Sequence, residues 1–350
     1  MPETLYRGRQ AAYLENEHVR VTVLREGGHI AELLARSSGV NPLWTPGWPT
    51  IEPSTYDPQR HPEYGGGGDA RLLAGLMGHN LCLDMFGGPS AAEAAAGLGV
   101  HGEGSNATYE LSEAGGELRM RGDFRLSAMR VERRLELHGA WVRIRETVES
   151  LAAFDRPMGW TQHVTLGPPF VENGVTQIRT AATRSMVFPG VFSPADDLVE
   201  GAEFRWPQAP ARGGGTRDLS GFTPARVSGA YTVHLMDPAR EHGWFTAYSP
   251  RLRTMCGYVW RRADFPWMGM WEENRSRPNP PWNGAAVTQG MEFGASPFPE
   301  TRREMVDRGS LFGVPGFRWL PARGRLEAEY WATVAPAELA PAGPLAWPGN

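Results

Sequence analysis

The chain has 350 residues, which is long enough for one large all-β domain or for two domains of ordinary size. Its net charge of −4 argues against a basic nucleic-acid-binding face, and it has no apolar run near the roughly 18 residues that span a bilayer. All 35 basic residues are arginine, so enzymes that depend on a Schiff-base or P-loop lysine are excluded.

The N-terminal part is expected to form a β-meander with strands near 11–15, 18–25 and 28–36. Gly27 and Gly28 mark the turn between the last two. No apolar segment of a secretory signal precedes these strands, and we therefore expect a cytoplasmic protein. The segment 46–70 is rich in proline and glycine and too long for a plain connector, which indicates a functional loop or lid. A short helix is expected at 91–97.

Residues 105–150 alternate between apolar and polar side chains, which predicts antiparallel strands with one solvated face. Turns are expected at 115–116, 122–123 and 138–139. Further strands are predicted at 158–166, 174–187, 229–236, 243–249, 253–260, 267–273, 286–294 and 326–334. A loop is expected at 207–218, a helix at 300–309 and an irregular tail at 336–350. The 43 glycines and 30 prolines suit many short strands, and we expect one all-β domain over 1–350.

The two cysteines, Cys82 and Cys256, both lie in apolar surroundings. Buried free thiols are the simplest interpretation, because disulfides are rare in a reducing cytosol.

The stretch GWTQHVTLGPPF at 159–170 carries a histidine in the middle of a predicted strand. Alternation places Thr161, His163 and Thr165 on one face, and Trp160 and Gln162 on the other. His163 therefore lies on a face of small polar residues, which is typical of the floor of a cleft. The competing interpretation is a half-buried histidine whose ring is satisfied by a backbone carbonyl.

The stretch VTQGMEFGASPFPE at 287–300 has the same pattern. Gly290, Glu292 and Gly294 share one face, so the acidic side chain has a glycine on each side. Space beside a carboxylate indicates room for a ligand. The alternative is an edge-strand glutamate that faces water.

Three other stretches carry candidate substrate-binding residues. GLGVHGEGSN places His101 and Glu103 in a glycine-rich turn, and GHNLCLDMFGG contains Asn80 and Asp84. In YVWRRADFPWMGMWEEN, Trp267, Gly269, Trp271 and Glu273 share one face, and the two tryptophans could form a stacking shelf with a gap for a sugar ring. Trp260 in the same stretch is a further candidate for stacking on a sugar.

A carboxylate, one or two histidines, aromatic rings and no lysine suit proton transfer on a neutral polyol. A hydrolase with two carboxylates is disfavoured, because no second carboxylate has a comparable setting. A metal-dependent enzyme is a further alternative, although the spacing matches no recognised metal motif. Its ligands would come from His61, Glu63, His79, His101 and Glu103.

These motifs, in this order along 20–335, resemble the galactose mutarotase-like (aldose 1-epimerase) superfamily, in particular its divergent bacterial members. GGHIAEL and GVNPLW resemble its opening motifs, and GLGVHGEGSN resembles the segment that carries its first active-site histidine, here His101. GWTQHVTLGPPF resembles the strand with the general-acid histidine, here His163. QGMEFGASPFPE resembles the strand with the general-base glutamate, here Glu292.

The resemblance implies a β-supersandwich, a large twisted antiparallel sandwich whose concave face holds a sugar. It also implies an enzyme without a cofactor that interconverts the anomers of a monosaccharide by ring opening. We expect His163 and Glu292 to face each other across a groove with a sugar-sized gap. One departure concerns the arginine of the family's N-R-I segment, because the nearest counterpart, around Asn80 and Asp84, has none. The alternative is a carbohydrate-binding protein without turnover on the same fold.

Overall fold

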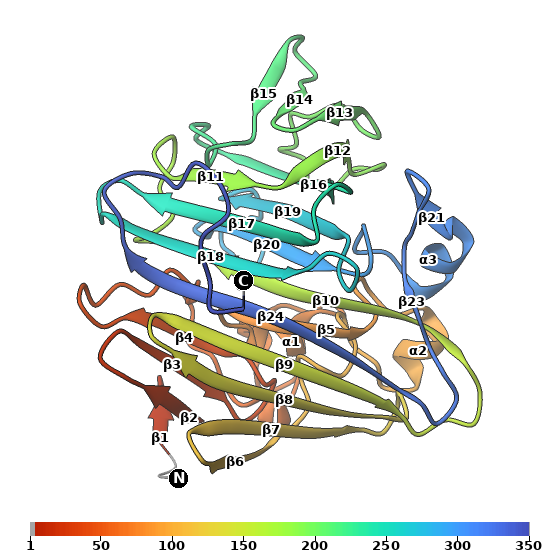
Figure 1. Ribbon diagram of the computed structural model, residues 1–350. Helices are drawn as coiled ribbons and strands as arrows, with labels where there is room; N and C mark the ends of the chain where they lie inside the picture. Colours follow the sequence, from red (N-terminus) through yellow and green to blue (C-terminus); the bar gives the residue numbers. More distant parts are fainter. Residues whose placement is uncertain (1–3, 350) are drawn as a thin grey trace.

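The computed structural model describes residues 4–349 as two large antiparallel β-sheets packed face to face (Figure 1). Within this range the larger sheet has 12 strands. Its order is β1 (Thr4–Tyr6), β2 (Arg9–Glu15), β3 (Val19–Leu24), β4 (Ile30–Ala35), β5 (His79–Asp84), β10 (Arg156–Leu166), β20 (Val287–Gly294), β19 (Trp267–Asn274), β16 (Ser228–Met236), β12 (Ala182–Val187) and β13 (Glu203–Arg205). The short strand β23 (Arg318–Leu320) pairs with the start of β10.

The second sheet has eight strands among the same residues. Its order is β11 (Gln177–Thr180), β17 (His242–Ser249), β18 (Thr254–Arg261), β24 (Arg325–Pro336), β9 (Trp141–Ser150), β8 (Met129–His138), β7 (Glu117–Phe124) and β6 (Glu110–Ala114). Two hairpins stand apart, β14 (Gln208–Pro210) with β15 (Thr216–Asp218) and β21 (Ser310–Leu311) with β22 (Val314–Pro315). The helices are short: η1 (Pro53–Thr55), η2 (Pro62–Tyr64), α1 (Ala70–Gly75), α2 (Ala91–Ala95) and α3 (Arg302–Arg308). The sequence-based prediction of an all-β sandwich is confirmed.

The main apolar core lies between the two sheets, and it contains a buried ion pair. Arg133 on β8 lies 2.7 Å from Glu146 on β9. The other oxygen of Glu146 accepts hydrogen bonds from Trp160 at 2.9 Å and Gln162 at 2.6 Å, both on β10. Tyr330 on β24 also donates to Glu146. Because every member is hydrogen-bonded, the pair is tolerated in the core, whereas removal of one partner costs about 3–5 kcal/mol. This network fixes β10 from its core side.

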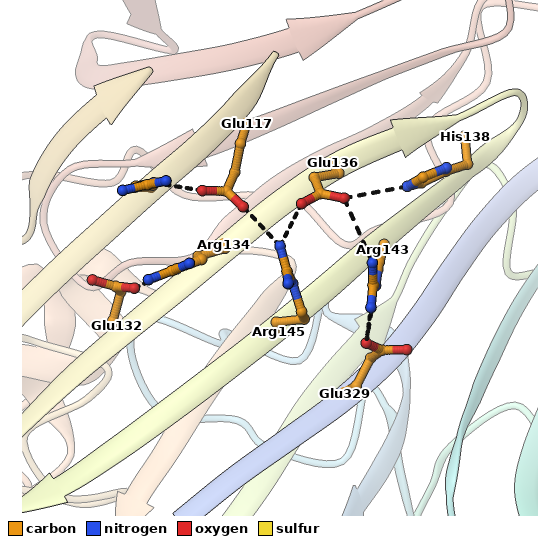
Figure 2. Close-up of polar contacts among 9 residues, drawn as sticks. Glu117, Glu132, Arg134, Glu136, His138, Arg143, Arg145 and Glu329 are labelled. Atoms are coloured by element: carbon orange, nitrogen blue, oxygen red, sulfur yellow. Dashed lines mark hydrogen bonds and ion pairs between the residues drawn. The ribbon is translucent and has the colours of Figure 1, made fainter. Parts of the chain in front are cut away.

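The outer face of the eight-stranded sheet is covered by alternating arginine and glutamate side chains (Figure 2). Arg145 bridges Glu117 and Glu136, and Arg143 contacts Glu329 at 2.6 Å. The expected solvated face is therefore confirmed, and its charged side chains pair across the strands. Exposed pairs of this kind contribute about 0–1 kcal/mol each, and they serve mainly to keep the outer face polar.

Several predicted boundaries differ from the structure. The turn expected at 122–123 is wrong, because Gly122 lies inside β7, where a β-carbon would press on the ring of Tyr109. The single strand expected at 174–187 is two strands, β11 and β12, that belong to different sheets. Residues 79–84, which were not predicted as a strand, form β5 in the middle of the larger sheet. The expected loop at 207–218 contains the β14–β15 hairpin.

The segment 46–70 lies beside the larger sheet and is held there by Arg9 of β2. This arginine is buried, and it donates to the carbonyl of Gly75 at 2.5 Å and contacts Glu52 at 3.3 Å. The segment leads directly into α1, so its end is fixed beside the sheet. The helix predicted at 300–309 is α3, with a capping box between Thr301 and Glu304.

The last part of the chain after β24 crosses the outer side of the eight-stranded sheet (Figure 1). Trp347 packs edge-on against His242, with ring centroids 4.9 Å apart. No helix or strand follows Pro336 within the described residues, as predicted for the tail. None of the helices in residues 4–349 has the length and apolar character needed to cross a membrane.

Candidate active site

Three neighbouring strands place three polar side chains in one row. Asn80 on β5 lies directly opposite His163 on β10, and His163 lies directly opposite Glu292 on β20. The flanking residues Gln162 and Phe293 point into the core between the sheets. The row therefore lies on the other face, as the alternation along β10 and β20 predicts.

His163 and Glu292 are in contact. Nε2 of the imidazole lies 3.1 Å from Oε1 of the carboxylate, and both side chains are buried. The expected sugar-sized gap between them is wrong, because residues directly opposite on adjacent strands have β-carbons only about 4.5–5.5 Å apart. Nδ1 of His163 lies 3.1 Å from the hydroxyl of Thr165, which fixes the ring from its other side.

Burial sets the electrostatics of this pair. It lowers the pKa of His163 well below its usual value, and the neighbouring His101 lowers it further. Burial also raises the pKa of Glu292 well above its usual value, and the positive charge of Arg277 opposes this rise. Both shifts disfavour the charged forms, which favours a neutral imidazole beside a protonated carboxyl group.

His101 lies beside this pair. Its backbone has a φ of 66°, a left-handed conformation that is uncommon for a residue with a side chain and that clusters at functional sites. Its Nδ1 donates to the carbonyl of Phe86 at 2.5 Å, which leaves Nε2 as an acceptor. The ring centroids of His101 and His163 are 5.1 Å apart. Burial lowers the pKa of His101 to about 4, so its ring is neutral at physiological pH.

The pair and His101 line a cavity of about 400 Å³, a size within the range of small-molecule sites. The cavity floor is formed by the larger sheet, and one wall is formed by α1 and the end of the segment 46–70. The residues that line it are Gly68, Asp69, Leu72, Leu73, Leu76, Phe86, Gly87, Gly88, Val100, His101, His163, Phe192, Tyr231, Trp271, Arg277, Trp282, Glu292 and Pro299. The segment expected to be a loop or lid thus contributes directly to the cavity.

Arg277 is a further cavity residue, and no motif in the sequence indicates it. Its guanidinium lies over the rings of Trp271, at 5.3 Å, and Trp282, at 4.8 Å. Its Nε lies 3.3 Å from Glu273, which also accepts a hydrogen bond from the backbone of Ser276 at 2.6 Å. Glu273, predicted to bind substrate, does not line the cavity. It instead fixes the arginine that does.

Three other candidates hold the surroundings of the cavity in place. Asp84 is fully buried and pairs with Arg156 and with Arg302, the latter at 3.0 Å. Glu103 accepts from the backbone of Ser127 at 2.6 Å. The amide of Asn80 donates to Ser105 at 2.9 Å. None of the three lines the cavity, although Asn80 lies beside His163 in the row.

The two tryptophan candidates differ in their placement. Trp271 lines the cavity, and its indole N–H finds no hydrogen-bond partner among the described residues. Trp260 lies on β18 in the other sheet, stacked on Phe293 with centroids 4.2 Å apart, and its N–H donates to the carbonyl of Phe265 at 2.8 Å. The structure therefore places Trp260 in the core between the sheets and away from this cavity.

The gaps left by glycines on the floor are filled by protein atoms. A β-carbon on Gly290 would overlap the carboxylate of Glu292, and one on Gly269 would overlap the hydroxyl of Tyr231. The expected space for a ring between Trp267 and Trp271 is therefore wrong. The glycines instead allow the functional side chains to lie flat against the sheet.

The residues considered as metal ligands are dispersed. His79 points into the core, 3.0 Å from Gln162, whereas His61 lies between Tyr56 and Tyr64 in the segment 46–70. Within residues 4–349, no group of three or more histidine, cysteine, aspartate or glutamate side chains is arranged to hold a metal ion. Both cysteines are buried and free, as predicted.

A larger cavity, of about 860 Å³, lies on the outer face of the eight-stranded sheet. Its lining is dominated by paired arginine and acidic side chains, with Trp331 and Trp347 at one side. It contains neither His163 nor Glu292. The smaller cavity is therefore the candidate active site, because it holds the buried pair with shifted pKa values.

No protein-family model matches the chain, and no curated protein does so. Solved structures with similar architecture include a protein from Klebsiella pneumoniae that is provisionally described as an aldose 1-epimerase. It has a TM-score of 0.65 and 12% identity, over 95% of this chain and 80% of that one. A protein from Escherichia coli K12 with the same provisional description has a TM-score of 0.63 and 12% identity, over 93% and 98% of the two chains.

A galactose mutarotase-like protein from Clostridium acetobutylicum has a TM-score of 0.61 and 12% identity, over 96% of this chain and 98% of that one. Likeness at this level of identity concerns the fold, and it extends over 93–96% of this chain and 80–98% of the other three. The resemblance predicted from the sequence motifs is thus confirmed for the fold: the chain has the architecture of the galactose mutarotase-like proteins.

Proposed function

We propose that this protein is an aldose 1-epimerase-like isomerase that interconverts the anomers of a sugar by opening and reclosing its ring. The observation that carries the proposal is the buried contact between His163 and Glu292 on the floor of a cavity of small-molecule size. The solved structures described as aldose 1-epimerases and mutarotase-like proteins support it through the shared fold.

The chemistry requires proton exchange at two oxygens of the same carbon. The anomeric hydroxyl O1 and the ring oxygen O5 are both bonded to C1, so they are close neighbours in any aldose. An acid and a base in direct contact can therefore reach both oxygens at once. This explains why a pair on adjacent strands suits the reaction better than a pair separated by the width of a ring.

In the forward step Glu292 removes the proton of the anomeric hydroxyl while His163 protonates the ring oxygen. The C1–O5 bond breaks, and the products are an open-chain aldehyde and a pair that still holds one proton. Rotation about C1–C2 presents the other face of the carbonyl. Reclosure then reverses both proton transfers. The neutral pair of the free enzyme has the same proton count as the carboxylate–imidazolium pair, so no proton has to enter from solvent.

The groups around the pair support these roles. Thr165 fixes Nδ1 of His163, so Nε2 stays directed at Glu292 and the cavity. His101 is neutral and offers Nε2 as an acceptor, which suits a sugar hydroxyl beside the reacting carbon. Arg277 offers donors, and its positive charge favours the carboxylate form of Glu292.

The test is the rate of anomer equilibration of freshly dissolved sugars, followed by polarimetry or by proton NMR of the anomeric signals. The proposal expects acceleration that depends on enzyme concentration for at least one aldose. Saturable binding of that aldose without any acceleration would instead identify a carbohydrate-binding protein.

A further inference from the structure

The polar groups of the cavity are gathered around the His163–Glu292 pair. The ring of His101 lies 5.1 Å from that of His163, and the ring of Trp271 lies 5.8 Å from it. Arg277 stacks over Trp271 and acts electrostatically on Glu292. Asp69 acts electrostatically on both His101 and Arg277. The side chains of His101, Trp271 and Arg277 thus gather around the pair, whereas Asp69 lies at the start of α1.

The remaining wall is apolar. Helix α1 and the residue after it contribute three leucines, Leu72, Leu73 and Leu76, each only 4% exposed. Phe86 and Phe192 add two aromatic rings, which both pack on Tyr231 with centroids 6.2 and 5.4 Å away. These side chains belong to one apolar cluster, with Phe192 at its edge. Ten of the 18 residues that line the cavity carry apolar or aromatic side chains, whereas five are ionisable.

A fully hydroxylated hexose is a poor match for a cavity whose polar side chains surround the pair and whose remaining wall is apolar. The pair occupies O1 and O5, and four hydroxyls remain that each need a partner once water is excluded. The C6 hydroxymethyl group is the only substituent that carries its hydroxyl on a carbon outside the ring, so this hydroxyl extends beyond the ring itself. A hydroxyl placed against leucine loses its hydrogen bonds to water and gains no new partner.

We propose that the substrate of this site is a 6-deoxyaldose, whose C6 methyl group packs against the wall formed by Leu72, Leu73 and Leu76. This inference rests on the proposed function and narrows its substrate class. Burial of a methyl group against leucine is favourable, and it leaves no polar atom without a partner. The polar cluster then binds the ring hydroxyls close to the reacting carbon.

Matched pairs of sugars test the proposal directly. D-galactose is compared with D-fucose, and D-glucose with 6-deoxy-D-glucose, so that the members of each pair differ only by the oxygen on C6. D-xylose, which lacks C6, is the third arm. Binding is measured by calorimetry, and turnover is measured by NMR of the anomeric signals. The expected result is a 10- to 100-fold advantage of the 6-deoxy member in both Kd and kcat/KM, a size typical of discrimination in an apolar pocket. Xylose is expected to fall below the 6-deoxy sugars.

Equal or better binding of the parent hexose in both pairs would overturn the substrate class while leaving the proposed isomerase intact. Preferential binding of the 6-deoxy sugar without turnover would uphold the substrate class and overturn the proposed reaction. Failure of every aldose to bind would overturn both. The two proposals therefore fail in distinguishable ways.

Variants of Leu72 test whether the leucine wall causes the preference for 6-deoxy sugars. Leu72→Asn supplies a hydrogen-bonding group, and it is expected to shrink the 6-deoxy advantage at least several-fold. Leu72→Ala, which adds no polar atom and is the safer variant for folding, is expected to weaken 6-deoxy binding more than hexose binding. Leu311→Ala is the matched control, because Leu311 belongs to the same apolar cluster but does not line the cavity. An unchanged preference in both folded Leu72 variants would contradict the assignment.

Discussion

The carboxylate of Glu292 lies against the bare α-carbon of Gly290, two residues earlier on β20. A β-carbon at this position would overlap Oε1, the oxygen that lies 3.1 Å from Nε2 of His163. The glycine therefore makes room for the carboxylate that we propose as the general base. The need for this space explains why a glycine stands two residues before Glu292 on β20.

Gly290→Ala is expected to displace the carboxylate of Glu292 and to lower the rate of anomer equilibration by about 10–100-fold, because misplacement of about 1 Å can cost a factor near 10². The variant should keep its fold, since the severe conflict is with the end of the Glu292 side chain, and the contact with the β-carbon of Trp271 at 3.0 Å needs only a small shift. Gly213→Ala is the control, because a β-carbon there meets no atom within 4 Å. Full activity of a folded Gly290→Ala protein would contradict the placement of Glu292.

Arg277→Gln is expected to raise KM about 10–100-fold, since a hydrogen bond to a charged group contributes about 1.5–3 kcal/mol. Glu273→Gln should change KM in the same direction but less, because it loosens the arginine without removing it. Steady-state kinetics with the best sugar measures both effects. Arg303→Gln, which changes an exposed arginine of α3, should leave KM unchanged. The role of Arg277 is refuted if its variant and this control behave alike.

The acid limb of the pH profile of kcat/KM is expected to have its midpoint below pH 6.5. The pair works with one proton, and it loses activity at low pH when His163 takes up a second. Burial and the neighbouring His101 lower the pKa of His163, so this uptake occurs below the ordinary value for histidine. Initial rates between pH 4.5 and 8 measure the limb. A midpoint at or above 6.5 would mean that His163 is solvated or paired with a fixed carboxylate.

Folding stability is expected to fall as the pH drops below about 6.5. Buried histidines among the described residues have lowered pKa values, which reach about 3 for His29 and His234. Below pH 6.5 the unfolded chain binds protons that the folded chain does not, so the free energy of unfolding decreases with falling pH. Each such histidine contributes up to about 1.4 kcal/mol per pH unit.

A variant of His234 tests this pH dependence of stability without a change in the cavity. His234 forms hydrogen bonds with Ser185 at 2.8 Å and Thr232 at 2.9 Å, and it does not line the cavity. Denaturant unfolding of His234→Gln at pH 7, 6 and 5 should give lower stability at pH 7 but a pH slope smaller by about one proton. Identical slopes for the variant and the parent chain would show that His234 is charged in the folded state.

Strand periodicity made the fold and the central pair predictable. Alternation along β10 and β20 placed His163 and Glu292 on the face away from the core, and the paired strands then brought them together. What periodicity could not give is the strand order. Residues 79–84 carry buried side chains on both faces, so their polar and apolar residues do not alternate, and β5 was missed.

The rest of the site depends on contacts between distant segments. Arg277 follows β19 in a proline-rich connection, and only its stacking on Trp271 and Trp282 reveals that it faces the cavity. Trp260 is a reasonable stacking candidate by composition, but the register of β18 directs its side chain into the core between the sheets. Asp84 lies opposite Gly159 of β10, and two arginines from elsewhere in the chain pair with its carboxylate.

The most direct test of the account compares the parent chain with His163→Asn and Glu292→Gln in anomer equilibration, measured by NMR at neutral pH. Removal of a general acid or base should lower the rate by about 10²–10⁴-fold in each variant, and the double variant should lose little more, because the two groups act as a unit. Sugar binding should persist in the folded single variants. Near-parental rates in either folded variant would contradict the assignment of this pair as the acid and base.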